Sequence, residues 1–290
     1  MKPDFSKIDI SYPESKNKYS DLLMTEVPGL APYTRGNYTS MYLQHPMEVW
    51  YEPETNDPKE LNHSLKQLIS SGAGNFQFGA DPLSLKDWKI IFSKINLKNI
   101  KAGFNSLENF HSFNEYLKSE NEDASKFTIR IFAETKDMSS LKAFKNVKVI
   151  LKMNELTELI SIASEIKDLD KNLAIRFKTT SYFESIAAMR SARRIWSETA
   201  NDENAKLSLD VLIPGSENNL VKSTTIAVAA WMGGAQSITI PLSPNWENEA
   251  FVNIPRIIEE ETHIQNTIDA LGGAFHLEKL TEDYVNTTLK

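Results

Sequence analysis

Short strand-like apolar stretches alternate along this chain with stretches that have the pattern of amphipathic helices. The strand-like stretches lie at 75–80, 99–104, 127–133, 147–152, 173–178, 207–213 and 235–240. Apolar residues at helical spacing occur at 61–69, 83–95, 107–119, 155–167, 183–198 and 219–231. This alternation is typical of parallel strands joined by right-handed crossovers. The pattern predicts an α/β fold, a (β/α)8 TIM-type barrel over residues 61–290, with 274–278 as candidate eighth strand.

An open doubly wound sheet is the alternative fold with the same order of elements. A dinucleotide-binding sheet of that kind would have a glycine-rich loop directly after its first strand. Gly72 and Gly74 precede a strand instead, and Gly233-Gly234 follows a helical stretch. These glycines suit turns and helix ends, so the barrel is favoured.

The first 60 residues differ from the rest because proline is concentrated there. Seven of the twelve prolines are Pro3, Pro13, Pro28, Pro32, Pro46, Pro53 and Pro58. Proline disfavours regular structure, yet a disordered tail would not keep this many apolar and aromatic residues. We interpret residues 1–60 as an extended, ordered arm. It either packs on its own barrel or wraps a partner subunit, and the partner-wrapping arm is our working hypothesis.

Composition narrows the classes of partner and site. The net charge of −7 disfavours nucleic acid or an anionic membrane as the main partner. The chain has no cysteine, which excludes disulfides and thiolate chemistry. The first residues lack the apolar core of a signal peptide, and no apolar run is long enough to span a bilayer, so we expect a cytoplasmic protein.

Candidate catalytic groups are few. The histidines have no metal-site spacing, and none follows directly after one of the seven predicted strands; they are His45, His63, His111, His263 and His276. Asp81 and Glu134 follow strands, but Asp81-Pro82 is also a good helix start. We therefore predict no catalytic residue, no cofactor site and no metal site in this chain.

Alternation within the strands predicts a charged barrel interior. One face of each strand is apolar and suits the helix layer, so the other face should enter the lumen. The charged residues on that second face are Lys101, Arg130, Glu134, Lys148, Lys152, Arg176, Lys178 and Asp210. Six basic residues meet only two acidic ones in this set, so water, an anion or other acidic groups must balance them. We expect these side chains, apart from Lys152, to block the barrel axis.

Four sequence motifs, in order, resemble methylmalonyl-CoA mutases. The first is Pro28-Gly-Leu-Ala-Pro-Tyr-Thr-Arg-Gly-Asn-Tyr-Thr-Ser-Met-Tyr42, which meets every fixed position of the family pattern P-G-x-x-P-[FY]-x-R-G-x-Y-x-[ST]-M-Y. The others are Ala192-Arg-Arg-Ile-Trp196, Asn218-Asn-Leu-Val-Lys through Gly233-Gly-Ala-Gln-Ser237, and Ile258-Glu-Glu-Glu-Thr262 followed by Asp269 and Gly273–Glu278. The first motif gives the candidate arm residues Arg35, Gly36, Tyr38, Ser40, Met41 and Tyr42.

The resemblance implies a barrel that threads coenzyme A along its axis and a separate C-terminal domain that holds adenosylcobalamin. This chain departs from that pattern. It lacks the D-x-H-x-x-G cobalamin motif, and the catalytic tyrosine–histidine pair has no match. His45 and Trp50 stand where the resemblance implies arginines for coenzyme A phosphates, and Glu52 stands where it implies an active-site tyrosine.

These departures resemble the small, non-catalytic subunit of the family. We expect a barrel-only chain without a C-terminal cobalamin domain, paired as a heterodimer with a large catalytic subunit of propionate metabolism. That partner would hold adenosylcobalamin and interconvert methylmalonyl-CoA and succinyl-CoA. The alternative is a catalytic acyl-CoA mutase barrel that works with a cobalamin domain on a separate chain.

Overall fold

Eight parallel strands close into a barrel in the computed structural model, which describes residues 26–137, 141, 144, 146–166, 173–177, 181–200, 205–214, 219–243 and 249–290. The strands are β1 (Glu48–Pro53), β2 (Asn75–Phe78), β3 (Lys101–Phe104), β4 (Ile129–Phe132), β5 (Val147–Met153), β6 (Leu173–Phe177), β7 (Ser208–Leu212) and β8 (Ser237–Leu242). Each strand pairs with the next, and β8 closes the ring on β1, with Trp50 opposite Thr239. The predicted TIM-type barrel is confirmed.

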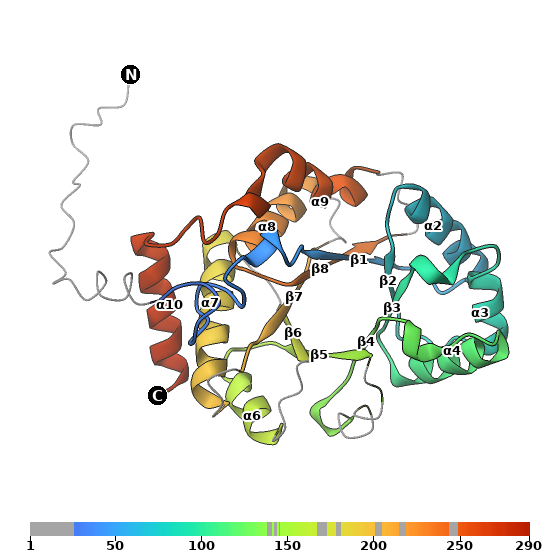
Figure 1. Cartoon of the computed structure of the whole chain (residues 1–290), viewed down its shortest axis with the longest axis horizontal. Coiled ribbons are helices and arrows are strands. Elements are labelled where there is room, and N and C mark those ends of the chain that lie inside the picture. The colour runs from blue at the N-terminus through green and yellow to red at the C-terminus, as the bar shows by residue number, and fades with distance from the viewer. Residues whose placement is uncertain are drawn as a thin grey trace, which may run out of the picture.

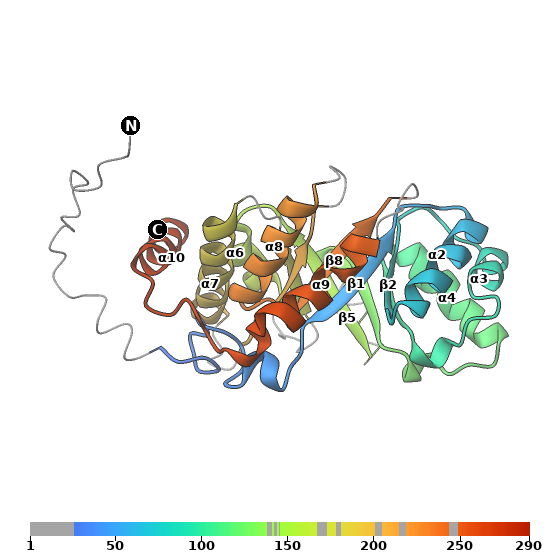
Figure 2. The same cartoon turned by 90° about the horizontal axis from the view of Figure 1, so that it is seen from above.

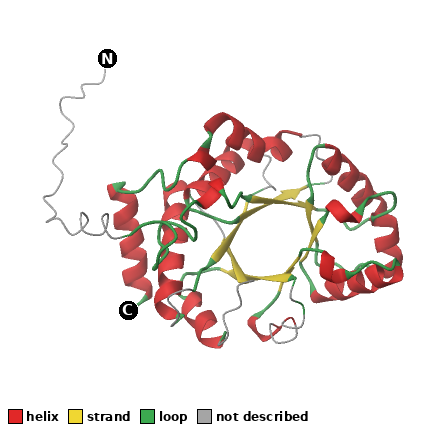
Figure 3. Ribbon diagram, viewed as in Figure 1, coloured by secondary structure: helices red, strands yellow, loops and turns green. Residues whose placement is uncertain are grey.

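Helices surround the ring of strands (Figures 1 and 3). They are α2 (Pro58–Ser70), α3 (Leu85–Ile91), α4 (Leu107–Ser119), α6 (Glu158–Glu165), α7 (Tyr182–Thr199), α8 (Leu220–Met232), α9 (Glu249–Thr262) and α10 (Phe275–Thr288). Side-chain caps fix several starts, because Asp57 accepts from the second and third amides of α2, and Ser84 forms a capping box with Asp87. Helix α10 packs outside α7, at one end of the molecule (Figure 2).

Two expectations about the ends of the barrel are wrong. Residues 274–278 are not a strand, because helix α10 begins at Phe275. The first strand is Glu48–Pro53, inside the stretch predicted as arm, so the boundary at residue 60 is also wrong. Prolines on both sides and two glutamates on its inward face hide this strand in the sequence. β1 lies where the ring closes, and it pairs with β2 on one side and β8 on the other.

The main hydrophobic core lies between the strands and the helix layer. Outward side chains such as Phe76, Phe78 and Phe104 are fully buried there. The rings of Phe78 and Phe104 pack edge-on against Trp88 of α3, at 5.0 and 5.9 Å between centroids. This apolar outer face directs the polar face of each strand inward, as the alternation predicted.

The described part of the arm packs on its own barrel. Tyr33, Met41 and Tyr42 are buried, and Met41 and Tyr42 belong to the main core. Partner wrapping by residues 1–25 lies outside the described residues and stays a prediction. Within the described ranges, every helix is too short or too polar to cross a membrane.

Candidate functional site

Asp210 of β7 is the centre of a buried charge network in the barrel lumen. Its Oδ2 accepts from Nε of Arg176 at 2.6 Å, and its Oδ1 accepts from Nη1 of Arg130 at 3.0 Å. Ser237 donates to Oδ1 at 2.6 Å. Burial favours a raised pKa for the Asp210 carboxyl, but Arg176, Arg130 and the Ser237 hydrogen bond outweigh it and lower the pKa to about 2. The carboxylate is therefore charged at neutral pH.

Arg130 spans the lumen in the middle of the barrel. Its Nε donates to Oε1 of Gln77 on β2 at 2.6 Å, and its Nη2 donates to Oγ1 of Thr239 on β8 at 2.8 Å. With Asp210 on β7, these contacts join four strands through one guanidinium. Arg130 and Asp210 are 1% and 0% exposed. Burial lowers the pKa of Arg130 to about 9, with Asp210 opposing that shift.

Aromatic rings close the remaining space around the two arginines. The guanidinium carbon of Arg130 lies 3.8 Å from the ring centroid of Trp50, and that of Arg176 lies 4.0 Å from the ring centroid of Phe132. Stacking on a ring satisfies the faces of a guanidinium that hydrogen bonds cannot reach. Trp50 and Phe132 are also buried. The four residues of these two stacks are thus at most 8% exposed.

Gly103 on β3 leaves room for this layer. A Cβ atom at residue 103 would lie 2.1 Å from Oε1 of Gln77 and 3.0 Å from Cγ of Arg130. Any larger residue at this strand position would displace side chains that the network holds in place. The glycine therefore serves the packing of the lumen.

Ion pairs also line the two mouths of the barrel. At the amino ends of the strands, Lys101 pairs with Glu48 at 2.7 Å, and burial lowers the pKa of nearby Lys148. At the carboxyl ends, Asn105 donates to Glu52, which lies 4.0 Å from Nη1 of Arg176. Glu48 and Glu52 come from β1, so the strand that the sequence concealed supplies acidic groups that the predicted lumen lacked.

Three residues of the predicted inward face need comment. Glu134 does not enter the lumen: its side chain is 72% exposed and pairs with Lys136 at 2.5 Å. It follows the end of β4, where strand alternation no longer sets direction. Lys178 lies outside the described residues. Lys152 is exposed at the carboxyl mouth, with its Nζ 5.6 Å from the Phe132 ring centroid.

The family-like motifs meet in a second buried charge cluster, at the amino ends of β7 and β8. Arg35 pairs with Asp269 at 2.6 Å and with Glu278 at 3.0 Å, and Arg190 of α7 binds the same two carboxylates. Burial alone would lower the pKa of the Arg35 guanidinium. The hydrogen bond with Asp269 and the charge of Glu278 outweigh burial, so this pKa is raised. This arm cluster ties residues 35, 190, 269 and 278 together.

Backbone carbonyls extend the arm cluster. Arg193 donates to four carbonyl oxygens, those of Tyr33, Thr34, Gly233 and Gly234, at 2.7 to 3.2 Å. The Tyr42 hydroxyl donates to the Ala235 carbonyl at 2.7 Å, and burial raises its pKa. The other three sequence motifs therefore all contact the first, and these contacts hold the arm against the barrel.

The other arm residues play smaller parts. Gly36 has φ +137°, and a Cβ atom there would lie 2.4 Å from Sδ of Met41. Tyr38 stacks on exposed His45, with 3.8 Å between ring centroids. Ser40 donates to Gln44 at 3.0 Å. Within the described residues, no group of three or more histidine or acidic side chains could hold a metal ion.

Comparison with known proteins identifies the family of this chain. The family described as Methylmalonyl-CoA mutase matches residues 3–85 and 156–290. The chain belongs to the methylmalonyl-CoA mutase family. The unmatched stretch 86–155 contains β3, β4 and β5, and it therefore contributes Lys101, Arg130 and Lys148 to the lumen.

Curated relatives within this family match the chain in part. Methylmalonyl-CoA mutase of Escherichia coli (strain K12) is 29% identical over 43% of this chain and 21% of its own length. The 2-hydroxyisobutanoyl-CoA mutase large subunit of Aquincola tertiaricarbonis is 27% identical over 49% and 29%. The methylmalonyl-CoA mutase small subunit of Streptomyces virginiae is 26% identical over 38% and 21%. The matched stretches thus span less than a third of each relative.

A solved structure supports the fold alone. A truncated 3-deoxy-D-arabino-heptulosonate 7-phosphate synthase from Thermotoga maritima superimposes with a TM-score of 0.50 at 16% identity, over 78% of this chain and 88% of that one. For this mutase-family barrel, sequence reasoning missed Trp50, Glu48 and Glu52 as lumen residues, because it did not find β1. Their period-two spacing was the available signal.

Proposed function

We propose that this chain is a non-catalytic barrel subunit of a cobalamin-dependent acyl-CoA mutase. It pairs with a large catalytic subunit, which holds adenosylcobalamin and interconverts methylmalonyl-CoA and succinyl-CoA. The observation that carries the proposal is the buried Arg130–Asp210–Arg176 network across the barrel axis.

A threaded coenzyme A thioester needs the volume that this network occupies. Pantetheine could pass the middle layer only if Arg130 and Arg176 left Asp210, with their charges still inside the barrel. Breaking a buried ion pair in this way costs about 3–5 kcal/mol. The residues present therefore do not fit an axial acyl-CoA.

The positions that depart from the catalytic pattern contribute to the network. Trp50, where the resemblance implies a phosphate-binding arginine, stacks under the guanidinium of Arg130. Glu52, where it implies an active-site tyrosine, accepts from Asn105 and lies near Arg176. At both positions, a residue that the resemblance implies for ligand binding is replaced by one that contacts the lumen network.

The competing proposal is a catalytic barrel served by a cobalamin domain on a separate chain. A cavity of about 630 Å³ at the carboxyl ends of β4 and β5 favours it, since barrel enzymes place their sites at that face. Acidic side chains predominate among its charged residues, which are Glu134, Asp137, Lys152, Glu158 and Glu165. Carboxylates repel the phosphates of coenzyme A, so the non-catalytic proposal is better supported.

Titration calorimetry of the purified chain with methylmalonyl-CoA, succinyl-CoA and free coenzyme A tests the proposal. We expect no saturable heat up to millimolar ligand. Co-expression with a catalytic mutase subunit should give a 1:1 complex by size-exclusion chromatography with light scattering.

Adding a cobalamin domain and adenosylcobalamin to the chain alone should give no turnover. Saturable acyl-CoA binding or turnover in that mixture would overturn the proposal in favour of the competing one. Failure to form the complex would refute the pairing but not the absence of catalysis.

A further inference from the structure

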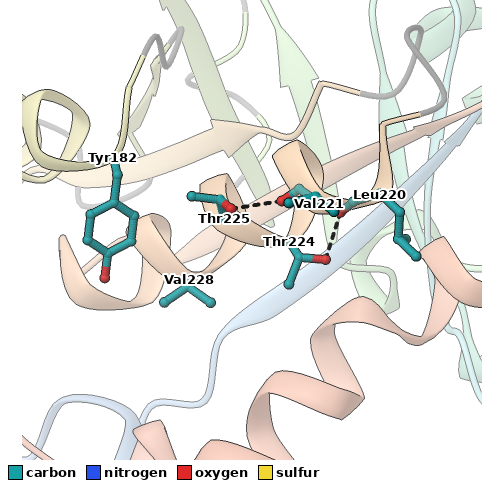
Figure 4. A pocket seen from close by; sticks show the side chains of 6 residues that line it. All are labelled: Tyr182, Leu220, Val221, Thr224, Thr225 and Val228. Atoms are coloured by element: carbon teal, nitrogen blue, oxygen red, sulfur yellow. Dashed lines mark hydrogen bonds between the residues drawn. The ribbon is translucent and has the colours of Figure 1, made fainter. Parts of the chain in front are cut away.

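Two features that the proposed function leaves unused differ in their chemistry. One is an apolar groove of about 400 Å³ between the start of α7 and the first turns of α8 (Figure 4). Thr224 and Thr225 in this groove donate to helix carbonyl oxygens four residues earlier, each at 2.8 Å, and its described lining has no charged side chain. The other feature is Lys148 of β5, whose amine is a nucleophile.

Lys148 lies on the inward face of β5, at the amino mouth of the barrel. It is opposite Arg130 in the register of β4 and β5, so two long basic side chains enter the lumen from neighbouring strands. Within the described ranges, the Lys148 Nζ makes no hydrogen bond or ion pair. Lys101, at the same mouth, pairs with Glu48 at 2.7 Å. Lys148 therefore lacks the carboxylate partner that Lys101 has.

The other charges of the described lumen balance one another. They are three cations, Lys101, Arg130 and Arg176, and three carboxylates, Glu48, Glu52 and Asp210. A protonated Lys148 adds a charge without a partner, which burial penalises. Burial accordingly lowers the pKa of the Lys148 amine, although the carboxylates of Glu48 and Asp210 oppose this shift. The charges of Arg130 and Lys101 add to it.

Solvent reaches the amino mouth of the barrel. The Lys101 and Glu48 side chains are 38% and 31% exposed, and Lys148 itself is half-buried. Arg130, its neighbour on β4, is only 1% exposed. A short acyl group can therefore approach Lys148 from the mouth without passing the network around Asp210.

We propose that the Lys148 amine accepts short acyl groups from acyl-CoA thioesters. Its neutral nitrogen attacks the carbonyl carbon of the thioester, a C–N bond forms and the C–S bond breaks. The thiolate of coenzyme A leaves and takes up the proton that the nitrogen releases, so the products are an amide and a free thiol. The amide is uncharged, which suits a position where an ammonium group has no partner.

Only the choice of donor rests on the proposed function, because acyl-CoA thioesters are the compounds that the catalytic partner would bind. The thioester carbonyl is at the tip of the pantetheine arm, so the nucleotide can stay outside the mouth. Acyl transfer by collision needs no saturable site, and it is compatible with the lack of acyl-CoA binding expected in calorimetry. The reactivity of the amine does not depend on pairing with a mutase.

Acetylation of the purified chain by acetyl-CoA and by a minimal thioester, S-acetyl-N-acetylcysteamine, tests the proposal. After brief exposure, the acetylated fraction of each lysine is measured by peptide mass spectrometry, in buffer and in urea. Lys101, at the same mouth but paired with Glu48, is the matched control. We expect the ratio of acetylation at Lys148 to that at Lys101 to be roughly tenfold higher in the folded chain than in urea, with either donor.

The pH dependence of acetylation distinguishes a neutral amine from an exposed one. The rate at Lys148 should level off at a lower pH in the folded chain than in urea, because burial favours the neutral amine. A folded-chain ratio no higher than the ratio in urea, or the same pH profile in both states, would overturn the proposal. Acetylation by the minimal thioester alone would overturn coenzyme A thioesters as the donor. Failure to pair with a mutase subunit would refute the proposed function and leave these rates unchanged.

Discussion

In the barrel lumen, Arg130 and Arg176 share the carboxylate of Asp210, whereas at the amino ends of β7 and β8 Arg35 and Arg190 share Asp269 and Glu278. The lumen network joins side chains of strands that backbone hydrogen bonds already hold together. The arm cluster instead joins segments far apart in sequence. The same chemistry therefore fills space in one region and ties chain segments in the other.

The two regions also differ in their relation to the family. Arg35, Arg190 and Asp269 of the arm cluster lie in stretches that match the mutase family. Arg176 and Asp210 of the lumen network also lie there, while Arg130 lies in the unmatched stretch 86–155. The family match therefore covers the whole arm cluster but only part of the lumen network. Five predictions sharpen this comparison.

Asp210→Ala should have the largest effect, because it leaves two buried guanidiniums without their shared carboxylate. We expect a loss of ~3–5 kcal/mol in the free energy of unfolding, measured by urea denaturation. The control is Glu134→Gln, which removes an exposed ion pair and should leave the midpoint unchanged. A loss no larger than that of the control would show that the lumen charges are not coupled.

The pH dependence of the unfolding free energy should also show the contribution of the Asp210 carboxylate. The pKa of Asp210 in the folded protein, about 2, lies below the unfolded value of about 3.9. Its contribution is therefore complete above about pH 4 and is lost as the pH falls towards 2. In Asp210→Asn, the unfolding free energy should fall less steeply over that interval than in the unaltered chain.

Arg35→Ala should destabilise less but more selectively, by about 2–3 kcal/mol, because Arg190 remains to pair with Asp269 and Glu278. Hydrogen exchange should increase over the arm and α10 before it increases in the strands. Uniform acceleration across the barrel would contradict a local tie. An Arg35→Ala/Asp269→Ala cycle measures the coupling directly.

Gly103→Ala tests how tightly the lumen is filled. The added Cβ would meet Gln77 and Arg130, so we expect a loss of ~1–3 kcal/mol by thermal or urea denaturation. Gly79→Ala is the matched control, since its Cβ would come no closer than 3.4 Å to Asn56 Oδ1. Equal effects at the two positions would show that the lumen can accommodate more volume.

Tyr42→Phe should have the smallest effect, about 1 kcal/mol, because it removes one hydroxyl donor from the Ala235 carbonyl and keeps the ring. Tyr38→Phe, which keeps the stack on His45, should be neutral by the same denaturation assay. If Tyr42→Phe leaves the free energy of unfolding unchanged, the arm cluster is stabilised by its ion pairs and not by this hydrogen bond.

Strand alternation in the sequence determined the lumen set in good part. It placed Arg130, Arg176 and Asp210 on one face because a period of two fixes the side of a strand on which each residue lies. It failed at Glu134, two positions beyond the end of β4, where no ladder holds the backbone. The four motifs likewise identified the family without showing that three of them converge on the first.

Only the tertiary structure decided which groups meet. Closure of the ring brought β1 beside β8, and with it came Glu48, Trp50 and Glu52, so the predicted excess of basic charge acquired carboxylates and a ring to stack on. It also brought Arg35 to Asp269, 234 residues later in the chain. The sequence determines which side chains face inward, because that is local geometry. Their pairing depends on the register of a closed barrel, which no local pattern contains.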